Sequence, residues 1–121
     1  DPRVDIGHVH LKVADLERAL AFYCGVLGFE LTQRYGEGAA FVSAGGYHHH
    51  IGLNTWESLG GAPPPPGTTG LYHTAIRYPD RAALAVHFAV PASRAFIAAA
   101  MKLAAGPPSL NIYEATPTQL P

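Results

Sequence analysis

The chain has 121 residues, of which 48% are hydrophobic and 14% are charged, and its formal net charge is −1. This length predicts a single domain, and the composition is typical of a packed globular protein rather than a disordered chain. A net charge so close to zero provides no basic surface for nucleic acid or anionic membranes, so neither partner is expected.

A single cysteine, Cys24, excludes an internal disulfide and is typical of a protein from a reducing cytoplasm. We expect it to be a small buried hydrophobe rather than a nucleophile. No apolar run approaches the roughly 20 residues that span a bilayer, and the first residues form no apolar signal-peptide region. The sequence therefore predicts a cytoplasmic domain.

Residues 6–29 predict a strand followed by a helix. Over residues 6–13 apolar side chains alternate with polar ones that include His8 and His10, as in a strand with one dry and one wet face. Asp15 has the chemistry of a helix N-cap, and Gly28 stands where a left-handed glycine would end the helix. The predicted apolar stripe of this helix consists of Leu16, Leu20, Tyr23 and Leu27.

Three more strands are predicted over residues 29–34, 39–43 and 47–54, with glycine turns between them. Residues 60–70 are mostly Gly, Pro and Thr, which predicts a semi-rigid connection. A strand with one histidine is predicted over residues 71–77, followed by Asp80 and an Ala/Leu-rich helix that reaches Phe88. The second half thus begins as the first half does, which is a weak internal repeat.

Three blocks of the sequence resemble the glyoxalase/bleomycin-resistance/dioxygenase (vicinal oxygen chelate) superfamily. They are GHVHLKVADL with the AFY and VLGF that follow (residues 7–29), FVSAGGYHHHIGLN (41–54) and GLYHTAI (70–76). The last two are closest to the bacterial catechol 2,3-dioxygenase-like branch. The resemblance implies an α+β fold in which paired βαβββ modules form a half-open mixed β barrel. Within one domain of residues 1–121, module one would span residues 5–57, the linker 58–69 and module two 70–121.

The resemblance also implies a histidine-liganded divalent metal, with Fe²⁺ expected first and Mn²⁺, Ni²⁺ or Zn²⁺ as alternatives. The family places one ligand on the first strand of each module, which implies His8 and His73, and often one on the fourth strand, where His50 stands. Strand parity agrees, because Ile51 on the dry face would turn His50 toward the cavity. A lone strand histidine is usually only solvated, but three at matching module positions favour a metal site.

The other histidines have different expected roles. His10 and His48 are the candidates for acid/base catalysis beside the metal. His49 is expected to pack outside the site, and His87 to be an ordinary surface residue of the second helix.

After about residue 90 the sequence departs from the family pattern, which continues with an Asp-Pro-Asp-Gly-Asn-Gly turn and a last strand bearing a metal-binding Glu. Glu114 is the only acidic residue after Asp80 and is the candidate replacement. Read one nucleotide out of phase, codons for the tail permit family-like pieces in the family's order. We hypothesise that the tail from about Val90 is frameshifted, with chance codon matches as the alternative. The second module would then be incomplete, and metal occupancy and activity would be reduced.

The function implied by the resemblance is metal-dependent, extradiol-type ring cleavage of a catecholic small molecule. One alternative is a glyoxalase-like lyase or isomerase, which would need a glutamate base. Another is a non-catalytic module that binds an antibiotic or a similar small molecule. A homodimer is expected, because an incomplete second module leaves apolar strand edges to be covered.

Overall fold

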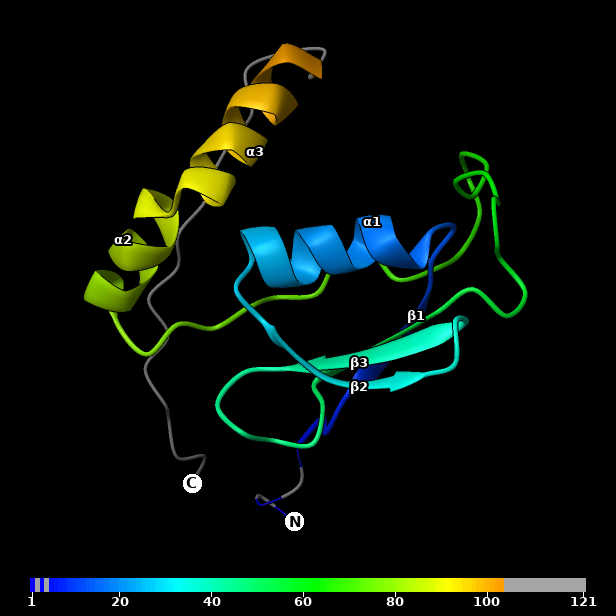
Figure 1. Ribbon diagram of the computed structural model, residues 1–121, viewed down its shortest axis with the longest axis horizontal. Helices are drawn as coiled ribbons and strands as arrows, with labels where there is room; N and C mark the ends of the chain where they lie inside the picture. Colours follow the sequence, from blue (N-terminus) through cyan, green and yellow to red (C-terminus); the bar gives the residue numbers. More distant parts are fainter. Residues whose placement is uncertain (2, 4, 104–121) are drawn as a thin grey trace.

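Four strands form a mixed sheet in the computed structural model, which describes residues 1, 3 and 5–103 (Figure 1). The sheet has the order β1-β4-β3-β2, in which β1 runs parallel to β4 and the other neighbours are antiparallel. The sheet does not close on itself, so the predicted α+β class and half-open barrel are confirmed. The strands are β1 (Val9–Lys12), β2 (Glu30–Tyr35), β3 (Ala39–Ser43) and β4 (Ile51–Asn54).

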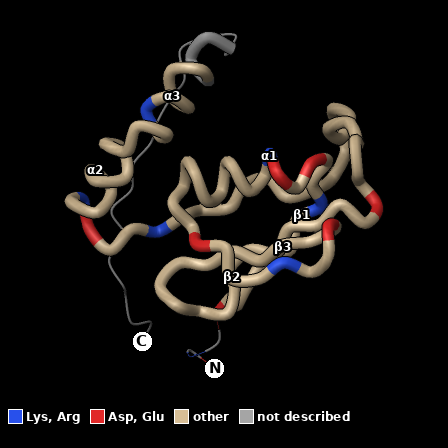
Figure 2. The backbone as a smooth tube through the Cα atoms, viewed as in Figure 1, with Lys and Arg blue, Asp and Glu red and all other residues tan. Residues whose placement is uncertain are grey.

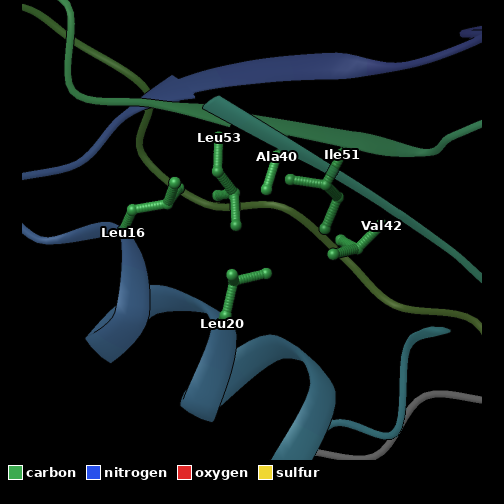
Figure 3. Packing of buried hydrophobic residues seen from close by; sticks show 6 residues of the cluster. All are labelled: Leu16, Leu20, Ala40, Val42, Ile51 and Leu53. Atoms are coloured by element: carbon green, nitrogen blue, oxygen red, sulfur yellow. The ribbon is translucent and has the colours of Figure 1, made fainter. Parts of the chain in front are cut away.

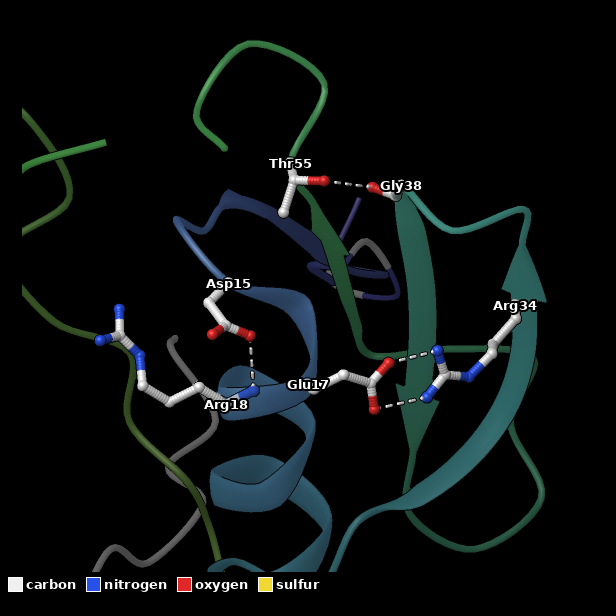
Figure 4. Close-up of polar contacts among 6 residues, drawn as sticks. All are labelled: Asp15, Glu17, Arg18, Arg34, Gly38 and Thr55. Carbon is white, nitrogen blue, oxygen red and sulfur yellow. Dashed lines mark hydrogen bonds and ion pairs between the residues drawn. The ribbon is translucent and has the colours of Figure 1, made fainter. Parts of the chain in front are cut away.

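The predicted first helix is present, but it changes type halfway along. It begins as α1 (Leu16–Leu20), where the Asp15 carboxylate accepts a hydrogen bond from the Arg18 N–H at 2.9 Å, as an N-cap does (Figure 4). It continues as the π-helix η1 (Ala21–Val26), which the sequence analysis did not predict. Gly28 ends it with a φ of 79°, the left-handed conformation expected there.

The π-helix changes which residues of the apolar stripe are buried. Leu16 and Leu20 are buried as predicted, whereas Tyr23 and Leu27 are only half-buried. A π turn contains more residues than an α turn, so the spacing of the last stripe positions no longer matches the face that meets the sheet. The stripe was therefore predicted correctly for α1 and less well for η1.

The hydrophobic core lies between α1 and one face of the sheet. Figure 3 shows Leu16 and Leu20 pointing from α1 toward apolar side chains of the two central strands, β3 and β4. Val9 and Leu11 of β1 pack against the edge of this cluster, which confirms the predicted dry face. Burial of this apolar area is the main stabilising contribution to the module. The strand residues of the core are Ala40, Val42, Ile51 and Leu53.

Two polar contacts join the parts of this module outside the core (Figure 4). The Arg34 guanidinium of β2 donates two hydrogen bonds to the Glu17 carboxylate of α1, at 2.6 and 3.0 Å, and lowers the pKa of that carboxyl. The pair is exposed, so it orients α1 over the sheet more than it stabilises the fold. At the end of β4, the Thr55 hydroxyl donates to the carbonyl of Gly38 at 3.4 Å, as Figure 4 shows, and the Thr55 N–H donates to the same carbonyl at 2.9 Å.

The predicted strand over residues 71–77 is wrong, because these residues form no strand and are exposed. A strand is stable only when neighbouring strands satisfy its backbone groups, and the described chain after residue 80 supplies helices instead. These are α2 (Arg81–Ala89), which Asp80 caps through a 2.8 Å hydrogen bond from the Ala83 N–H, and α3 (Pro91–Leu103). The second module therefore differs from the predicted repeat already before residue 90.

α3 is attached to η1 rather than to the sheet. The buried Ser93 hydroxyl donates to the carbonyl of Val26 at 2.8 Å, and the rings of Phe22 and Phe96 lie 5.1 Å apart. Figure 1 shows both late helices beyond the end of η1, away from the strands. Among the described residues, no single helix is long and apolar enough to cross a membrane, and only α2 and α3 together, bent by 75°, meet that criterion.

Charged side chains of both signs are scattered over the described chain. Figure 2 shows no stretch of backbone where one sign dominates, and α2 and α3 carry few charges. Lys12 of β1 forms an ion pair with Glu57, just beyond β4. This distribution fits the small net charge of the sequence.

Truncation of the core side chain Leu20 tests the packing of α1. Leu20 is only 7% exposed, so we expect the Leu20→Ala variant to lose about 2–5 kcal/mol of unfolding free energy, measured by denaturant unfolding. Leu31→Ala is the matched control, because Leu31 is 45% exposed on β2 and its truncation should cost less than about 1 kcal/mol. Equal losses from both variants would contradict the described core.

Candidate functional site

The face of the sheet opposite α1 carries a row of rings. His10 of β1 and Phe41 of β3 both lie beside Gly52 of β4 in the strand register. The His10 ring centroid is 5.9 Å from that of Phe41 and 5.8 Å from that of Trp56. We call this surface the histidine face. Its rings belong to His8, His10, Phe41, Tyr47, His48, His49, His50 and Trp56.

Gly52 makes room for the imidazole of His10. A Cβ atom at position 52 would lie 2.9 Å from both Cδ2 and Nε2 of His10, closer than real Cβ contacts come. The imidazole therefore occupies the space where a side chain of β4 would stand. This is why a glycine is found in the middle of a buried central strand, where it otherwise weakens the sheet.

Three histidines come together at one end of this face. One nitrogen of each of His8, His48 and His49 lies within 4.8 Å of the others. The centroid of the His49 ring is 4.4 Å from that of His8 and 4.4 Å from that of His48. His8 directly precedes β1, and the other two lie in the loop between β3 and β4. Imidazole nitrogens so arranged could hold a divalent metal ion.

A bulge in β2 holds the loop that carries these histidines. The register of β2 with β3 shifts between Leu31 and Gln33, which leaves Thr32 unpaired. The Thr32 hydroxyl contacts the carbonyl of Phe41 at 3.0 Å and that of His48 at 2.9 Å. The loop is thus fixed to the sheet at the residue that begins the histidine run.

The predicted strand over residues 47–54 begins only at Ile51, and this changes the position of His49. The turn at Gly45 and Gly46, with φ of 69° and 79°, leads into an irregular segment where side chains do not alternate as they do in a strand. His49 was expected to pack outside the site. Instead its ring lies beside that of His8 and 4.8 Å from that of Phe41.

His50 lies on the same face but is engaged in other contacts. Its Nδ1 accepts a hydrogen bond from the Ala44 N–H at 3.3 Å and lies 2.9 Å from the Ser43 hydroxyl. In the neutral form the proton is therefore on Nε2, which leaves no free lone pair for a metal. This hydrogen bonding does not suit the ligand role expected for His50.

A second expected ligand, His73, is not brought to His8 in the described structure. His73 lies in the segment without secondary structure, and its ring contact is with the neighbouring Tyr72. Among the residues that the structure describes, the group that could hold a metal contains neither His73 nor His50. Glu114 lies outside the described residues. The metal-binding roles of these residues stay predictions.

Partial burial shifts the pKa of His49 on the histidine face and that of Cys24 on the other side of the sheet. Partial burial lowers the pKa of His49, and the neighbouring histidines, His48 first, lower it further. His49 is therefore neutral near pH 7 and keeps one nitrogen lone pair. On the other side of the sheet, Cys24 is half-buried rather than buried as expected, and this partial burial raises the pKa of its thiol, which does not favour a nucleophile.

The histidine face is an open surface rather than an enclosed pocket. His8, His10 and His48 are all exposed. Two hollows lie on the other side of the molecule, beside the start of α1, and both are lined by Ala14 and Asp15. No histidine lines either hollow. A ligand at the histidine face would thus be covered only by further parts of the chain or by another chain.

Comparison with known proteins places the chain in a family. Residues 5–105 match the Glyoxalase/Bleomycin resistance protein/Dioxygenase superfamily, and the chain belongs to it. Over 73 residues, or 59% of the chain, it is 55% identical to the catechol-2,3-dioxygenase of Bacillus subtilis (strain 168). The match covers 26% of that relative, so the chain spans about a quarter of its length. No solved structure matches the chain significantly.

Substitution of Gly52 tests the contact with His10. We expect Gly52→Ala to displace the exposed imidazole and shift its nuclear magnetic resonance signals, because the new Cβ would lie 2.9 Å from the ring. The unfolding free energy should change by less than about 1 kcal/mol, since the ring can rotate away. Gly25→Ala is the matched control, because nothing lies within 4 Å of its added Cβ. Unchanged His10 signals in Gly52→Ala would contradict the described packing.

Proposed function

We propose that the protein is a metal-dependent, dioxygenase-type member of its superfamily that binds a catecholic small molecule on the histidine face. The observation that carries this proposal is the gathering of histidine and aromatic side chains on one open face of the sheet. The high identity to a catechol-2,3-dioxygenase over 73 residues supports the substrate class. Because the match covers only about a quarter of that relative, ring cleavage by this chain is our proposal and not a property taken from the comparison.

The residues of the face suit a planar substrate with two adjacent hydroxyls. Phe41 and Trp56 flank His10 and present ring surfaces against which an aromatic substrate would stack. The imidazole of His10 is exposed between them and would accept a proton from a catechol hydroxyl through a ring nitrogen.

The donors present on this face suit a divalent metal. Iron, nickel, zinc and manganese all accept imidazole nitrogen, and His8 is the ligand that both the resemblance and the described group include. A bound metal would supply a positive charge that favours ionised oxygens of a chelating substrate. Among the described residues no carboxylate joins the histidine group.

The second candidate function is non-catalytic binding of a small molecule. The openness of the histidine face favours it, because ring cleavage needs a site from which water is excluded. A glyoxalase-like reaction has less support, since it needs a glutamate base and the described histidine group contains none. Binding of catechol without oxygen consumption would identify the binding module.

Oxygen consumption tests the proposed reaction. We expect the chain supplied with Fe²⁺ and catechol to take up oxygen, more slowly than the Bacillus relative because the described site lacks a carboxylate ligand. His8→Ala should reduce this uptake at least about tenfold, while the matched control His87→Ala, on α2, should not. No uptake by the unchanged chain, with metal shown to be bound, would reject the proposal.

We also propose that the protein forms a homodimer. β1 and β2 are the edge strands of the sheet. The exposed apolar side chains of the described residues include Trp56, just beyond β4, at 61% exposure and Tyr35 of β2 at 67%. Unpaired strand edges and apolar surfaces of this kind are usually covered by another chain.

Light scattering measures the oligomeric state directly. We expect a mass twice that of the chain at micromolar concentrations, because the described residues of one copy leave the outer edges of β1 and β2 unpaired. A Trp56→Glu variant should shift the equilibrium toward the monomer, whereas a change at Arg3, which is exposed and pairs only locally with Asp1, should not. A monomeric mass over a wide concentration range would contradict the dimer.

A further inference from the structure

We propose that His8, His48 and His49 form a three-imidazole site for a borderline divalent cation such as Zn²⁺ or Ni²⁺, complete within module one. This proposal deepens the proposed function, on which it rests for the use of the histidine face. It differs from the expectation drawn from the family, because His73 and Glu114 take no part. Metal binding alone tests it, without any substrate.

The spacing of the three rings is close to that of a metal site. A tetrahedral zinc centre with bonds of about 2.0–2.1 Å separates its nitrogen ligands by about 3.3 Å. The nitrogens of His8, His48 and His49 lie within 4.8 Å of one another, so they need to approach by about 1.5 Å at most. His8 and His48 are exposed and free to rotate toward the half-buried His49.

The backbone that carries these side chains is already ordered. The carbonyl of His48 lies 2.9 Å from the Thr32 hydroxyl, and the carbonyl of His50 accepts from the Val9 N–H at 3.0 Å. The second of these bonds links the residue after His49 to the residue after His8. Ligands carried on an ordered backbone lose less conformational entropy on binding, so they bind an ion more tightly than a flexible histidine run does.

The donor set determines what such a site would do. Three neutral imidazoles leave both positive charges on the ion and keep at least one position open, as in zinc sites with three histidines and one water. No carboxylate joins the group among the described residues, so these residues do not compensate the charge. The open position would therefore favour an anionic, oxygen-chelating ligand.

Calorimetric titration of Zn²⁺ and of Ni²⁺ into the full chain, purified without an affinity tag, tests the site. We expect one ion per chain, with His8→Ala, His48→Ala and His49→Ala each weakening binding at least about tenfold, since even losing an outer-shell partner costs about 10–100-fold. His50→Ala and His73→Ala are the matched controls and should change the affinity by less than about threefold. Glutamine variants at the same positions, checked by circular dichroism, separate ligand loss from misfolding.

Three other outcomes would each overturn the proposal. A loss of binding in His8→Ala and His73→Ala but not in His48→Ala or His49→Ala would indicate the two-module site of the family. Binding that needs His50 but not His8 would indicate a flexible, tag-like run. No binding by the folded chain would exclude the site altogether.

The titration also separates this site from the proposed function. Metal bound as expected without oxygen uptake would reject ring cleavage and leave the site. Oxygen uptake that survives in both His48→Ala and His49→Ala would reject the site and leave the proposed reaction.

Discussion

The parallel pairing of β1 with β4 is the interaction on which the histidine face depends. β1 comes from the start of the chain, and the pairing of Val9 with Ile51 places it beside a strand about forty residues later. His8 and the run His48 to His50 directly precede these paired residues, so the parallel pairing brings them to the same end of the sheet. Without this register the histidines would be unrelated surface residues.

The core decides which way the paired strands face. Leu53 and Val42 are completely buried against α1, and their burial turns the alternate positions outward. Phe41 and His10 consequently project from the face opposite the helix. Burial of the apolar face against α1 thus both stabilises the module and fixes which side chains point to the histidine face. A one-residue slip of either strand would be opposed by the exposure of the whole apolar set.

Those parts of the fold whose signals are local were predictable from the sequence. The N-cap at Asp15, the glycine end at Gly28 and the strands around residues 30–43 depend on residues close together in the chain, and the structure has them where the sequence placed them. The strand over residues 71–77 has the right composition, but a strand also needs a neighbour, and that neighbour is not encoded nearby. The π turns of η1 carry no apolar spacing that distinguishes them from an α-helix.

The candidate site was predictable only where strand alternation holds. His8 and His10 belong to a regular apolar–polar pattern, so their face followed from Val9 and Leu11. His49 lies in the irregular loop before β4, where alternation gives the wrong side. The hydroxyl of Thr32, a residue that the bulge in β2 leaves out of the strand register, fixes that loop, and such a bulge leaves no signal in the composition of a single sequence.

The imidazole of His10 over Gly52 has a consequence for how sequences of this family can diverge. The two positions share one volume: a side chain at 52 requires the ring at 10 to be absent, smaller or turned away. The constraint acts in one direction, because losing the ring at 10 leaves Gly52 without a clash. Relatives with a side chain at 52 should therefore carry either a smaller residue at 10 or a ring turned away from β4.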